Sequence, residues 1–473
     1  MLVLINTNRM SPSIAPVGLD YVTSSAQQAG IDVELLDLGL VEKPEETMRD
    51  FFSKNMPELI GITFRNADDC FWPSADWFVP KLKNTIEEIR ALTDAPIVLG
   101  GIGFSIFAKP ILEYSGADFG IHGDGEIAIV ELMRQLRDHK NFANVPGLLW
   151  RNKNKILENH PSWPEPLSLG TERNFIDNLA YFKRGGQCGI ETKRGCNRNC
   201  IYCADPIAKG TKLRLRNPSE VVDEIQSLLK QGVDVLHICD SEFNLSYSHA
   251  LNICMEINKR SLGEKIKWYT YMSPAPFDAE LAKQMALAGC VGVDFTGDSA
   301  NETMLRTYNQ KHNKENIATG VKLCKENGMA VMVDLLLGGP GETPETAKET
   351  IDFAKEIDAD CIGATLGMRV YPGTFMEKYV KEQLHRGNHA AIRRKYTGPL
   401  NMLMPTFYIS EKLGEKPAEL IKDFINGDKR FFEPAGEDAS DYNYNDNTPL
   451  INAIKNGARG AFWHILNKLN KVS

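Results

Sequence analysis

The chain has 473 residues, 42% hydrophobic and 25% charged, which suits an ordinary folded protein of two or three domains. Its formal net charge of −8 argues against a broad basic face for nucleic acid. The apolar runs are strand-sized, shorter than the ~20 residues of a membrane span. Residues 1–5 form such a run, without the basic start and cleavage site of a signal peptide. We therefore expect a cytoplasmic protein with no membrane span.

Residues 1–165 alternate strand-like and helix-like segments, which predicts a doubly wound, Rossmann-like α/β domain. The predicted strands are short apolar runs at residues 2–5, 31–36, 59–63, 97–99 and 119–121, and helical periodicity is found at 19–29 and 77–92. Sheets of this kind bind ligands at the carboxyl ends of their strands. Here those ends carry Asn6, Arg65, Gly100, Gly101, Gly123, Gly125 and Glu126. The polar segment 151–166 is predicted to be a linker.

Residues 166–376 form a second βα series, with strands expected at 189–192, 235–238, 267–271, 291–295, 330–337 and 361–370. Six strands with intervening helices predict an open, partial (β/α)6 barrel rather than eight closed repeats. Residues 377–473 are expected to form a small, mostly helical C-terminal domain. It contains the polar stretch 438–447, and its last segment, 449–469, has apolar residues at helical spacing.

Three of the ten cysteines, Cys196, Cys200 and Cys203, lie within eight residues, in a loop after the first strand of the second series. Thiolates at this spacing can converge on one inorganic centre, and three of them suit a cubane iron–sulfur cluster with one open iron. A structural zinc site needs four ligands, usually as two pairs, and the sequence has no second cysteine pair. The spacing alone favours the iron–sulfur cluster over zinc.

The pattern Cys-x3-Cys-x2-Cys, with Tyr202 before its last cysteine, resembles the signature of the radical S-adenosylmethionine superfamily. The resemblance implies that Glu242 binds the methionyl amine of S-adenosylmethionine. It further implies ribose contacts from Asp298 and Ser299, a carboxylate contact from Arg306, an adenine-binding turn at Gly338, Pro340 and Gly341, and a closing segment that begins at Arg369. Two simpler interpretations stay open, because Gly338–Gly341 alone is only a turn and Asp298–Ser299 alone could cap a helix.

An α/β domain placed before such a barrel is similar to the cobalamin-binding members of the superfamily. Gly100, Gly101, Gly123 and Gly125, with Glu126, match their pattern, since glycines let the nucleotide tail of the cofactor approach the backbone. The loop that begins at Asn6 lacks the Asp-x-His-x-x-Gly motif that supplies a lower axial histidine, and the first histidine of the chain is His122. The resemblance therefore implies cobalamin bound base-off without a histidine ligand; a domain that has lost the cofactor is the alternative.

Residues 63–69 resemble the corresponding loop of the tryptophan 2-C-methyltransferase-like subgroup, in which an arginine lies beneath the cobalt. The polar stretch 441–447 and the segment 457–463 are also similar to that subgroup. This resemblance makes Arg65 the candidate catalytic residue. A surface or phosphate-binding arginine is the equally weighted alternative.

The family resemblance implies a C-methyltransferase that uses a 4Fe–4S cluster, S-adenosylmethionine and methylcobalamin. Its substrate would be a small molecule, a peptide or a biosynthetic intermediate, and an external donor such as flavodoxin or ferredoxin would reduce the cluster. One alternative keeps the cofactors but performs cyclisation or rearrangement. Another is an iron–sulfur electron-transfer or regulatory protein. Glu242 and the turn at Gly338 argue against the latter, because an electron carrier needs no adenosyl pocket.

Overall fold

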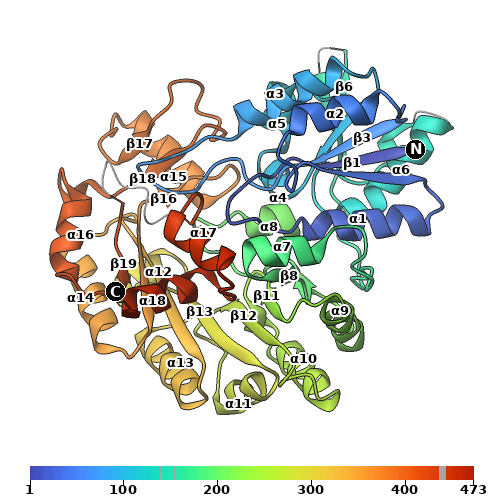
Figure 1. Ribbon diagram of the computed structural model, residues 1–473. Coiled ribbons are helices and arrows are strands. Elements are labelled where there is room, and N and C mark those ends of the chain that lie inside the picture. The colour runs from blue at the N-terminus through green and yellow to red at the C-terminus, as the bar shows by residue number, and fades with distance from the viewer. Residues whose placement is uncertain (139–140, 154, 436–443, 473) are drawn as a thin grey trace.

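The computed structural model describes residues 1–138, 141–153, 155–435 and 444–472. Two seven-stranded sheets dominate this part of the chain (Figure 1). The N-terminal sheet, in blue and cyan, lies at the upper right of the figure, and the second sheet, in green to orange, lies below it. The predicted α/β fold class, with a Rossmann-like sheet and a parallel barrel sheet, is confirmed. Within the described residues, no helix has the length and apolar character needed to cross a bilayer.

The N-terminal sheet has the strand order β2-β1-β3-β4-β5-β6-β7. Its strands are β1 (Leu2–Asn6), β2 (Val33–Asp37), β3 (Leu59–Thr63), β4 (Ile97–Gly100), β5 (Phe119–Ile121), β6 (Leu148–Asn152) and β7 (Lys155–Glu158). The first five are parallel, as expected, whereas β6 and β7 form an antiparallel hairpin at the edge. The linker expected at 151–166 was therefore wrong over its first half. An edge strand such as β7 is largely exposed, so its sequence is polar like that of a linker.

Helices cover both faces of this sheet, which makes it doubly wound. They are α1 (Val17–Gln28), α2 (Pro44–Phe52), α3 (Val79–Arg90), α4 (Ile102–Ile106), α5 (Ala108–Ser115) and α6 (Gly125–Arg137). Apolar residues of α1 and α6 pack on one face, and those of α2 to α5 pack on the other. The direction of winding reverses between β1 and β3, so a ligand is expected outside the carboxyl ends of these two strands.

The second sheet has the order β19-β15-β14-β13-β12-β11-β8, and all its pairs are parallel. Its strands are β8 (Cys188–Ile190), β11 (Val235–Ile238), β12 (Lys267–Met272), β13 (Cys290–Asp298), β14 (Ala330–Leu337), β15 (Cys361–Leu366) and β19 (Phe431–Phe432). The six expected strands are present in chain order, and β19 adds a seventh from the C-terminal segment. The packed helices are α9 (Pro218–Lys230), α10 (Tyr247–Lys259), α11 (Ala279–Leu287), α13 (Lys314–Glu326), α14 (Pro344–Glu356) and α16 (Pro417–Ile425).

The strand expected at 361–370 was wrong beyond residue 366. Gly367 has a φ of 96°, a conformation that favours glycine, and it turns the chain out of the barrel sheet. β16 (Met368–Arg369) then joins β17 (Ile392–Arg394) and β18 (Thr406–Tyr408) in an antiparallel sheet. The remaining short elements are α7 (Asn178–Gly185), β9 (Lys193–Arg194), α8 (Asp205–Lys209), β10 (Arg214–Leu215), α12 (Glu302–Thr307), and 3-10 turns at Phe142–Asn144, Phe243–Leu245 and Glu411–Leu413.

The C-terminal segment packs back onto the barrel. It contains α15 (Phe375–His385), α16, α17 (Thr448–Lys455) and α18 (Phe462–Val472). The single helix expected at 449–469 was wrong, because Gly457 and Gly460, with φ of 97° and 133°, separate α17 from α18. Residues 436–443, most of the predicted polar stretch, lie outside the described residues. The domain boundaries at 165 and 376 stay predictions.

A fully buried arginine ties the N-terminal sheet to the barrel. Arg173 Nε donates to Asp20 Oδ2 on α1 at 2.6 Å, and its Nη1 donates to Glu224 Oε1 on α9 at 2.8 Å. Glu224 also accepts from Tyr21 Oη at 2.8 Å and from Arg216 Nη1 at 2.6 Å. The guanidinium groups of Arg173 and Arg216 lie over the Tyr21 ring, 5.5 and 5.7 Å from its centre.

Two further arginines extend this contact to the start of α6. Arg194 donates to both carboxylate oxygens of Glu126, at 2.9 and 3.1 Å, and Arg214 pairs with Asp124. We call the whole set the charged seam; it comprises Asp20, Tyr21, Asp124, Glu126, Arg173, Arg194, Arg214, Arg216 and Glu224. Every arginine of the charged seam has a carboxylate partner.

Candidate active site

The three-cysteine loop runs from β9 to α8 at the carboxyl end of the barrel. Gly195 begins it with a φ of 87°, and a Cβ there would lie 2.0 Å from Lys212 O, so only glycine fits. The backbone N–H of Cys196 donates to Gly210 O at 3.1 Å, and that of Cys203 donates to Cys200 O at 3.2 Å. These bonds hold the three free thiols in one short loop.

The environment of the thiols fits a bound cluster. Burial raises the pKa of all three, that of Cys200 to about 12, so each thiol is neutral until a metal replaces its proton. In residues 1–138, 141–153, 155–435 and 444–472, no group of three or more His, Cys, Asp or Glu has the geometry to hold one metal ion. A cubane does not require such a group, because each thiolate binds a separate iron.

Glu242, after β11, lies beside this loop in a strained backbone conformation with φ of 128°. Thr296 Oγ1 donates to its Oε1 at 2.8 Å, and its buried Oε2 has no hydrogen-bond partner among the described residues. Burial raises the pKa of Glu242 to about 7. An orphaned carboxylate oxygen here suits the predicted role of accepting from an amine.

Tyr202, Asp298 and Gln310 form a hydrogen-bonded group beside Cys200. Tyr202 Oη donates to Asp298 Oδ2 at 2.6 Å, and the same oxygen accepts from Gln310 Nε2. Gln310 Nε2 also lies 3.4 Å from Cys200 Sγ. Burial raises the pKa of Asp298 to about 6. Sequence reasoning missed Gln310, because an isolated glutamine after a short helix carries no pattern.

The glycine-rich turn after β14 is built around a buried carboxylate. Glu342 accepts from the backbone N–H of Gly338 and of Gly339, and from Tyr308 Oη at 3.4 Å. Gly338 and Gly341, with φ of 89° and 85°, flank the buried Pro340. Burial raises the pKa of Glu342 to about 7. Glu342 was missed as well, although an acidic residue closing a glycine turn was a visible signal.

Two residues predicted to contact S-adenosylmethionine have other partners. The fully buried Ser299 hydroxyl lies 2.8 Å from Thr350 Oγ1 and accepts from Asn301 N at 3.1 Å. Arg306, with 71% of its side chain exposed, pairs with Glu302 one turn earlier on α12. Neither side chain joins the group around Cys200.

Three other predicted cofactor residues hold the structure together. Arg369 donates to Asp68 Oδ2 at 2.7 and 3.0 Å and to two backbone carbonyls, so its guanidinium is occupied. Asn6 is fully buried and donates to Asp37 Oδ1 at 2.9 Å. Glu126 belongs to the charged seam through Arg194.

The predicted glycines differ in what surrounds them. A Cβ on Gly101, whose φ is 96°, would lie 2.8 Å from Phe64 O, and one on Gly123, whose φ is 94°, would lie 2.9 Å from the Trp163 ring. A Cβ on Gly125 would lie 3.2 Å from Val22. No atom lies within 4 Å of the position that a Cβ on Gly100 would take.

Arg65 follows β3 at the point where the winding of the N-terminal sheet reverses. Its Nη1 donates to Asn66 Oδ1 at 3.1 Å and lies 3.8 Å from Met10 Sδ, and no carboxylate of the described chain pairs with it. Burial lowers its pKa, and the nearby thiols of Cys70 and Cys239 and the phenol of Tyr271 offset this in part. Cys239 follows β11 and Tyr271 lies on β12, so Arg65 faces the barrel.

The side chains around Arg65 are accessible to solvent although protein surrounds them. Arg65, Cys70, Cys239 and Tyr271 keep solvent-accessible area, 44% in the case of Tyr271, yet burial is the largest influence on the pKa of each. Side chains that are accessible to solvent and yet surrounded by protein are typical of a concave surface. We call this region the barrel mouth; it comprises Arg65, Cys70, Cys239, Tyr271, Asp294 and Asp334.

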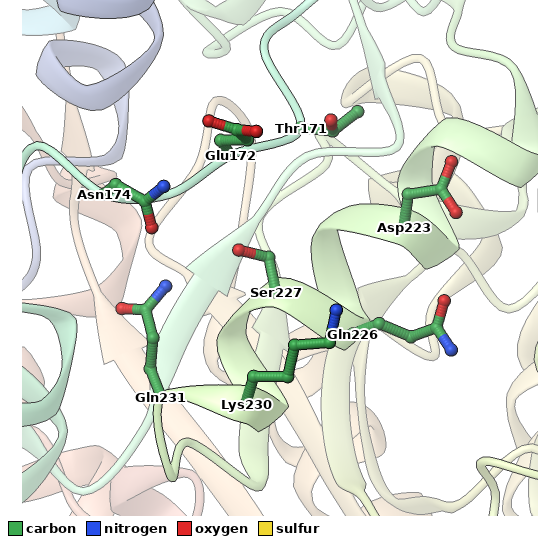
Figure 2. Close-up of a pocket in the computed structure, with 8 residues that line it drawn as sticks. All are labelled: Thr171, Glu172, Asn174, Asp223, Gln226, Ser227, Lys230 and Gln231. Atoms are coloured by element: carbon green, nitrogen blue, oxygen red, sulfur yellow. The ribbon is translucent and has the colours of Figure 1, made fainter.

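A separate hollow of about 400 Å³ lies beside α9 (Figure 2). It is lined by Thr171, Glu172, Asn174, Asp223, Gln226, Ser227, Lys230 and Gln231, and it shares no residue with the barrel mouth or the cysteine loop.

Residues 5–133 match the family model of the B12 binding domain, and residues 190–354 match that of the Radical SAM superfamily. The chain is 33% identical over 444 residues to tryptophan 2-C-methyltransferase of Streptomyces laurentii, covering 80% of this chain and 74% of that protein. It is 27% identical over 376 residues to an uncharacterized methyltransferase of Pyrococcus horikoshii, covering 77% of this chain and 78% of that protein.

Among solved structures, the chain is similar to the radical S-adenosylmethionine methyltransferase TsrM of Kitasatospora setae with tryptophan substrate and aza-SAM bound. The TM-score is 0.91 at 31% identity, over 100% of this chain and 99% of that one. The same protein with cobalamin and a [4Fe-4S] cluster gives 0.90 at 30% identity, over 100% and 98%. The chain therefore belongs to the cobalamin-dependent radical S-adenosylmethionine C-methyltransferases, which use a 4Fe–4S cluster, cobalamin and S-adenosylmethionine.

Proposed function

We propose that this enzyme methylates C2 of the indole ring of tryptophan. The similarity to tryptophan 2-C-methyltransferase and to a structure with tryptophan bound supports this substrate. The observation that carries the proposal within the chain is Arg65, an arginine without an acidic partner that faces the barrel from the switch point of the N-terminal sheet.

The described residues provide a place for each cofactor. Cys196, Cys200 and Cys203 would hold the cluster. Glu242, Asp298 and the turn at Gly338 would face S-adenosylmethionine, while Arg65 and Gly100 would face cobalamin. When bound, cobalamin supplies the methyl group and S-adenosylmethionine restores it.

Arg65 would keep the lower face of the cobalamin free of ligands. A guanidinium stays protonated and has no lone pair to donate to a metal, and its bulk excludes water. The first histidine of the chain, His122, follows β5 and not β1, and its Nε2 lies 2.9 Å from Ile207 O. Cobalamin would therefore be bound base-off without a histidine ligand. Electron paramagnetic resonance of the cobalt(II) form should show no axial splitting from a protein nitrogen; splitting in protein labelled with nitrogen-15 would contradict this.

The barrel walls suit a flat aromatic substrate. Tyr271 on β12 and His237 on β11 lie with ring centres 5.0 Å apart, and burial lowers the pKa of His237 to about 4, so the imidazole is neutral. A neutral aromatic wall can hold an indole ring by packing. The carbon that accepts the methyl group is sp2, so its methylation needs no hydrogen abstraction beforehand.

An external reductant such as flavodoxin or ferredoxin would keep the cluster reduced. A cytoplasmic location fits this requirement, because all ten cysteines of the chain are free thiols.

The test is product analysis. Anaerobically reconstituted protein with cobalamin, L-tryptophan and methyl-labelled S-adenosylmethionine should give labelled 2-methyltryptophan and S-adenosylhomocysteine in equal amounts. Formation of 5′-deoxyadenosine without methylated product would instead support rearrangement chemistry. If both are absent while the cluster and cobalamin are fully loaded, tryptophan is not the substrate.

A further inference from the structure

Two carboxylates lie side by side on the inner face of the barrel. Asp294 is on β13 and Asp334 on β14, and these strands pair in parallel, with Asp294 opposite Met332 and Thr296 opposite Asp334. Asp334 Oδ1 lies across Gly363 of β15, where a Cβ would come within 2.0 Å of it. The glycine at 363 thus makes room for the carboxylate.

Neither carboxylate accepts a hydrogen bond or forms an ion pair within the described chain, and the Oδ1 atom of each is buried without a partner. Asp294 is only 4% exposed. The carboxylates of Asp298 and Glu342, by contrast, accept from neighbouring N–H or O–H groups. Burying a carboxylate without a partner is costly, and such groups in native proteins usually complete their hydrogen bonds with a ligand or an ion.

Further carboxyl groups lie around this pair. Burial is the main cause that raises the pKa of both carboxyls, that of Asp334 to about 7, and the neighbouring carboxylates Glu242 and Asp298 raise them further. Lys193 Nζ lies 3.9 Å from Asp240, and no ion pair joins Lys193 or Arg65 to either aspartate in the described chain. A cationic ligand would favour the ionised form of these carboxyls, because each lacks a cationic partner in the described chain.

The pair also lies next to the aromatic wall. Tyr271 is directly opposite Asp294 in the register of β12 and β13, and 44% of its surface is accessible. A ligand with an aromatic ring against Tyr271 and a cationic group against the aspartates satisfies both. An aromatic amino acid with a free ammonium group has these two parts.

We propose that Asp294 and Asp334 bind the ammonium group of the substrate, so that the enzyme acts on a free amino acid or amine and rejects N-acylated or peptide-bound residues. This inference rests on the proposed function for its aromatic part. It gives the two aspartates a positioning and selectivity role and leaves the methyl transfer itself unchanged.

The first experiment compares the substrates tryptophan, tryptamine and N-acetyltryptophan at saturating cofactor. Tryptamine keeps the amine and should be methylated, whereas N-acetyltryptophan should lose at least about thirtyfold in kcat/KM, the scale of an unpaired buried charge. Equal turnover of N-acetyltryptophan and tryptophan would overturn the inference and leave the proposed function standing. Calorimetric binding of the three compounds is measured in parallel. Tight binding of the two amines without any methylated product would refute the proposed function instead.

The second experiment uses Asp294→Asn and Asp334→Asn, which keep the shape and remove the charge. Both should fold as well as the wild type, because each replaces a buried carboxyl without a partner by a neutral amide of the same shape. Their preference for tryptophan over N-acetyltryptophan, in binding and in KM, should collapse towards one. Asp352→Asn, at a half-exposed position paired with Lys348, is the matched control and should keep the full preference. An unchanged preference in both barrel variants would overturn the inference.

Discussion

The charged seam and the barrel mouth lie at the same interface between the two sheets, yet they treat buried charge in opposite ways. In the seam, Arg173 is fully buried and carries two carboxylate partners. In the barrel mouth, Arg65 has no carboxylate partner, and Asp294 and Asp334 accept no hydrogen bond in the described chain. Arg65 and the two aspartates lie in the same region but form no ion pair with one another in the described chain.

We infer from this difference that the charged residues of the seam stabilise the fold and that those of the mouth bind a ligand. Removing one partner of a buried ion pair leaves the other uncompensated and costs about 3–5 kcal/mol. Removing a desolvated charge that has no partner costs the fold nothing and can stabilise it. Substitutions in the seam should therefore act on stability, and those in the mouth on cofactor binding, substrate binding and turnover.

The largest effect is expected at the cysteine loop, which belongs to the ligand side of this comparison. Replacing Cys196, Cys200 and Cys203 together by Ala should abolish the reconstituted iron, about four per chain in the wild type, and all methylation. Iron analysis and absorbance measure this. Cys254→Ala, buried in α10 outside the loop, is the control and should keep its iron. A triple variant that retains a cluster would remove the loop from the active site.

In the seam, Glu224→Gln should lower the free energy of unfolding by about 3–5 kcal/mol. Glu224 accepts hydrogen bonds from Arg173, Arg216 and Tyr21. A neutral amide at this position would remove the negative charge that compensates the two buried guanidinium groups. Urea unfolding of the cofactor-free chain measures the change. Asp352→Asn, which breaks an exposed pair, should cost at most about 1 kcal/mol. A seam variant as stable as this control would contradict the structural role of the seam.

In the mouth, Arg65→Lys or Arg65→Ala should leave iron and cobalamin content near wild type and lower turnover roughly ten- to a hundredfold. This corresponds to ~1.4–2.7 kcal/mol of lost transition-state stabilisation. Arg260→Ala, which removes an arginine paired with Asp223 at the surface, is the control. Wild-type turnover of Arg65→Ala at full cobalamin occupancy would show that Arg65 has no part in the reaction.

A smaller effect is expected from Glu342, whose folded-state pKa of about 7 lies above the ordinary 4.5. Between these values the folded chain holds a proton that the unfolded chain has lost, so this group's contribution to stability falls as pH rises. Relative to Glu342→Gln, the wild type should lose about 2 kcal/mol between pH 5.5 and 7.5. Glu356→Gln, exposed at the end of α14, should follow the wild type. Parallel curves for wild type and Glu342→Gln would contradict this.

The sequence predicted correctly those features that depend on residues close together in the chain. The spacing of the three cysteines predicted their loop, and apolar runs predicted five parallel strands of one sheet and six of the other. The β6–β7 hairpin escaped prediction because an exposed edge is polar. The break at Gly367 escaped because the strand and the segment after it are both apolar.

The candidate site was harder to predict because its charges come from distant strands. Arg306 and Arg369 were chosen by their place in a motif, but one is exposed on α12 and the other is paired with Asp68. Asp294 and Asp334, to which we assign a role only in our proposal, were not among the predicted residues, although each interrupts a buried apolar strand, between Val293 and Phe295 and between Val333 and Leu335. A single charge inside a buried strand was the signal that could have found them.

The most direct test of this account compares the fully buried Arg173 with Arg65, which is accessible to solvent. Arg173→Met and Arg65→Met remove the same charge and keep similar apolar bulk, so their free energies of unfolding in the cofactor-free chain can be compared directly. The account predicts that Arg173→Met loses about 3–5 kcal/mol, while Arg65→Met is as stable as the wild type or more so. A loss in Arg65→Met as large as that in Arg173→Met would make Arg65 a structural residue and would contradict the distinction between seam and mouth.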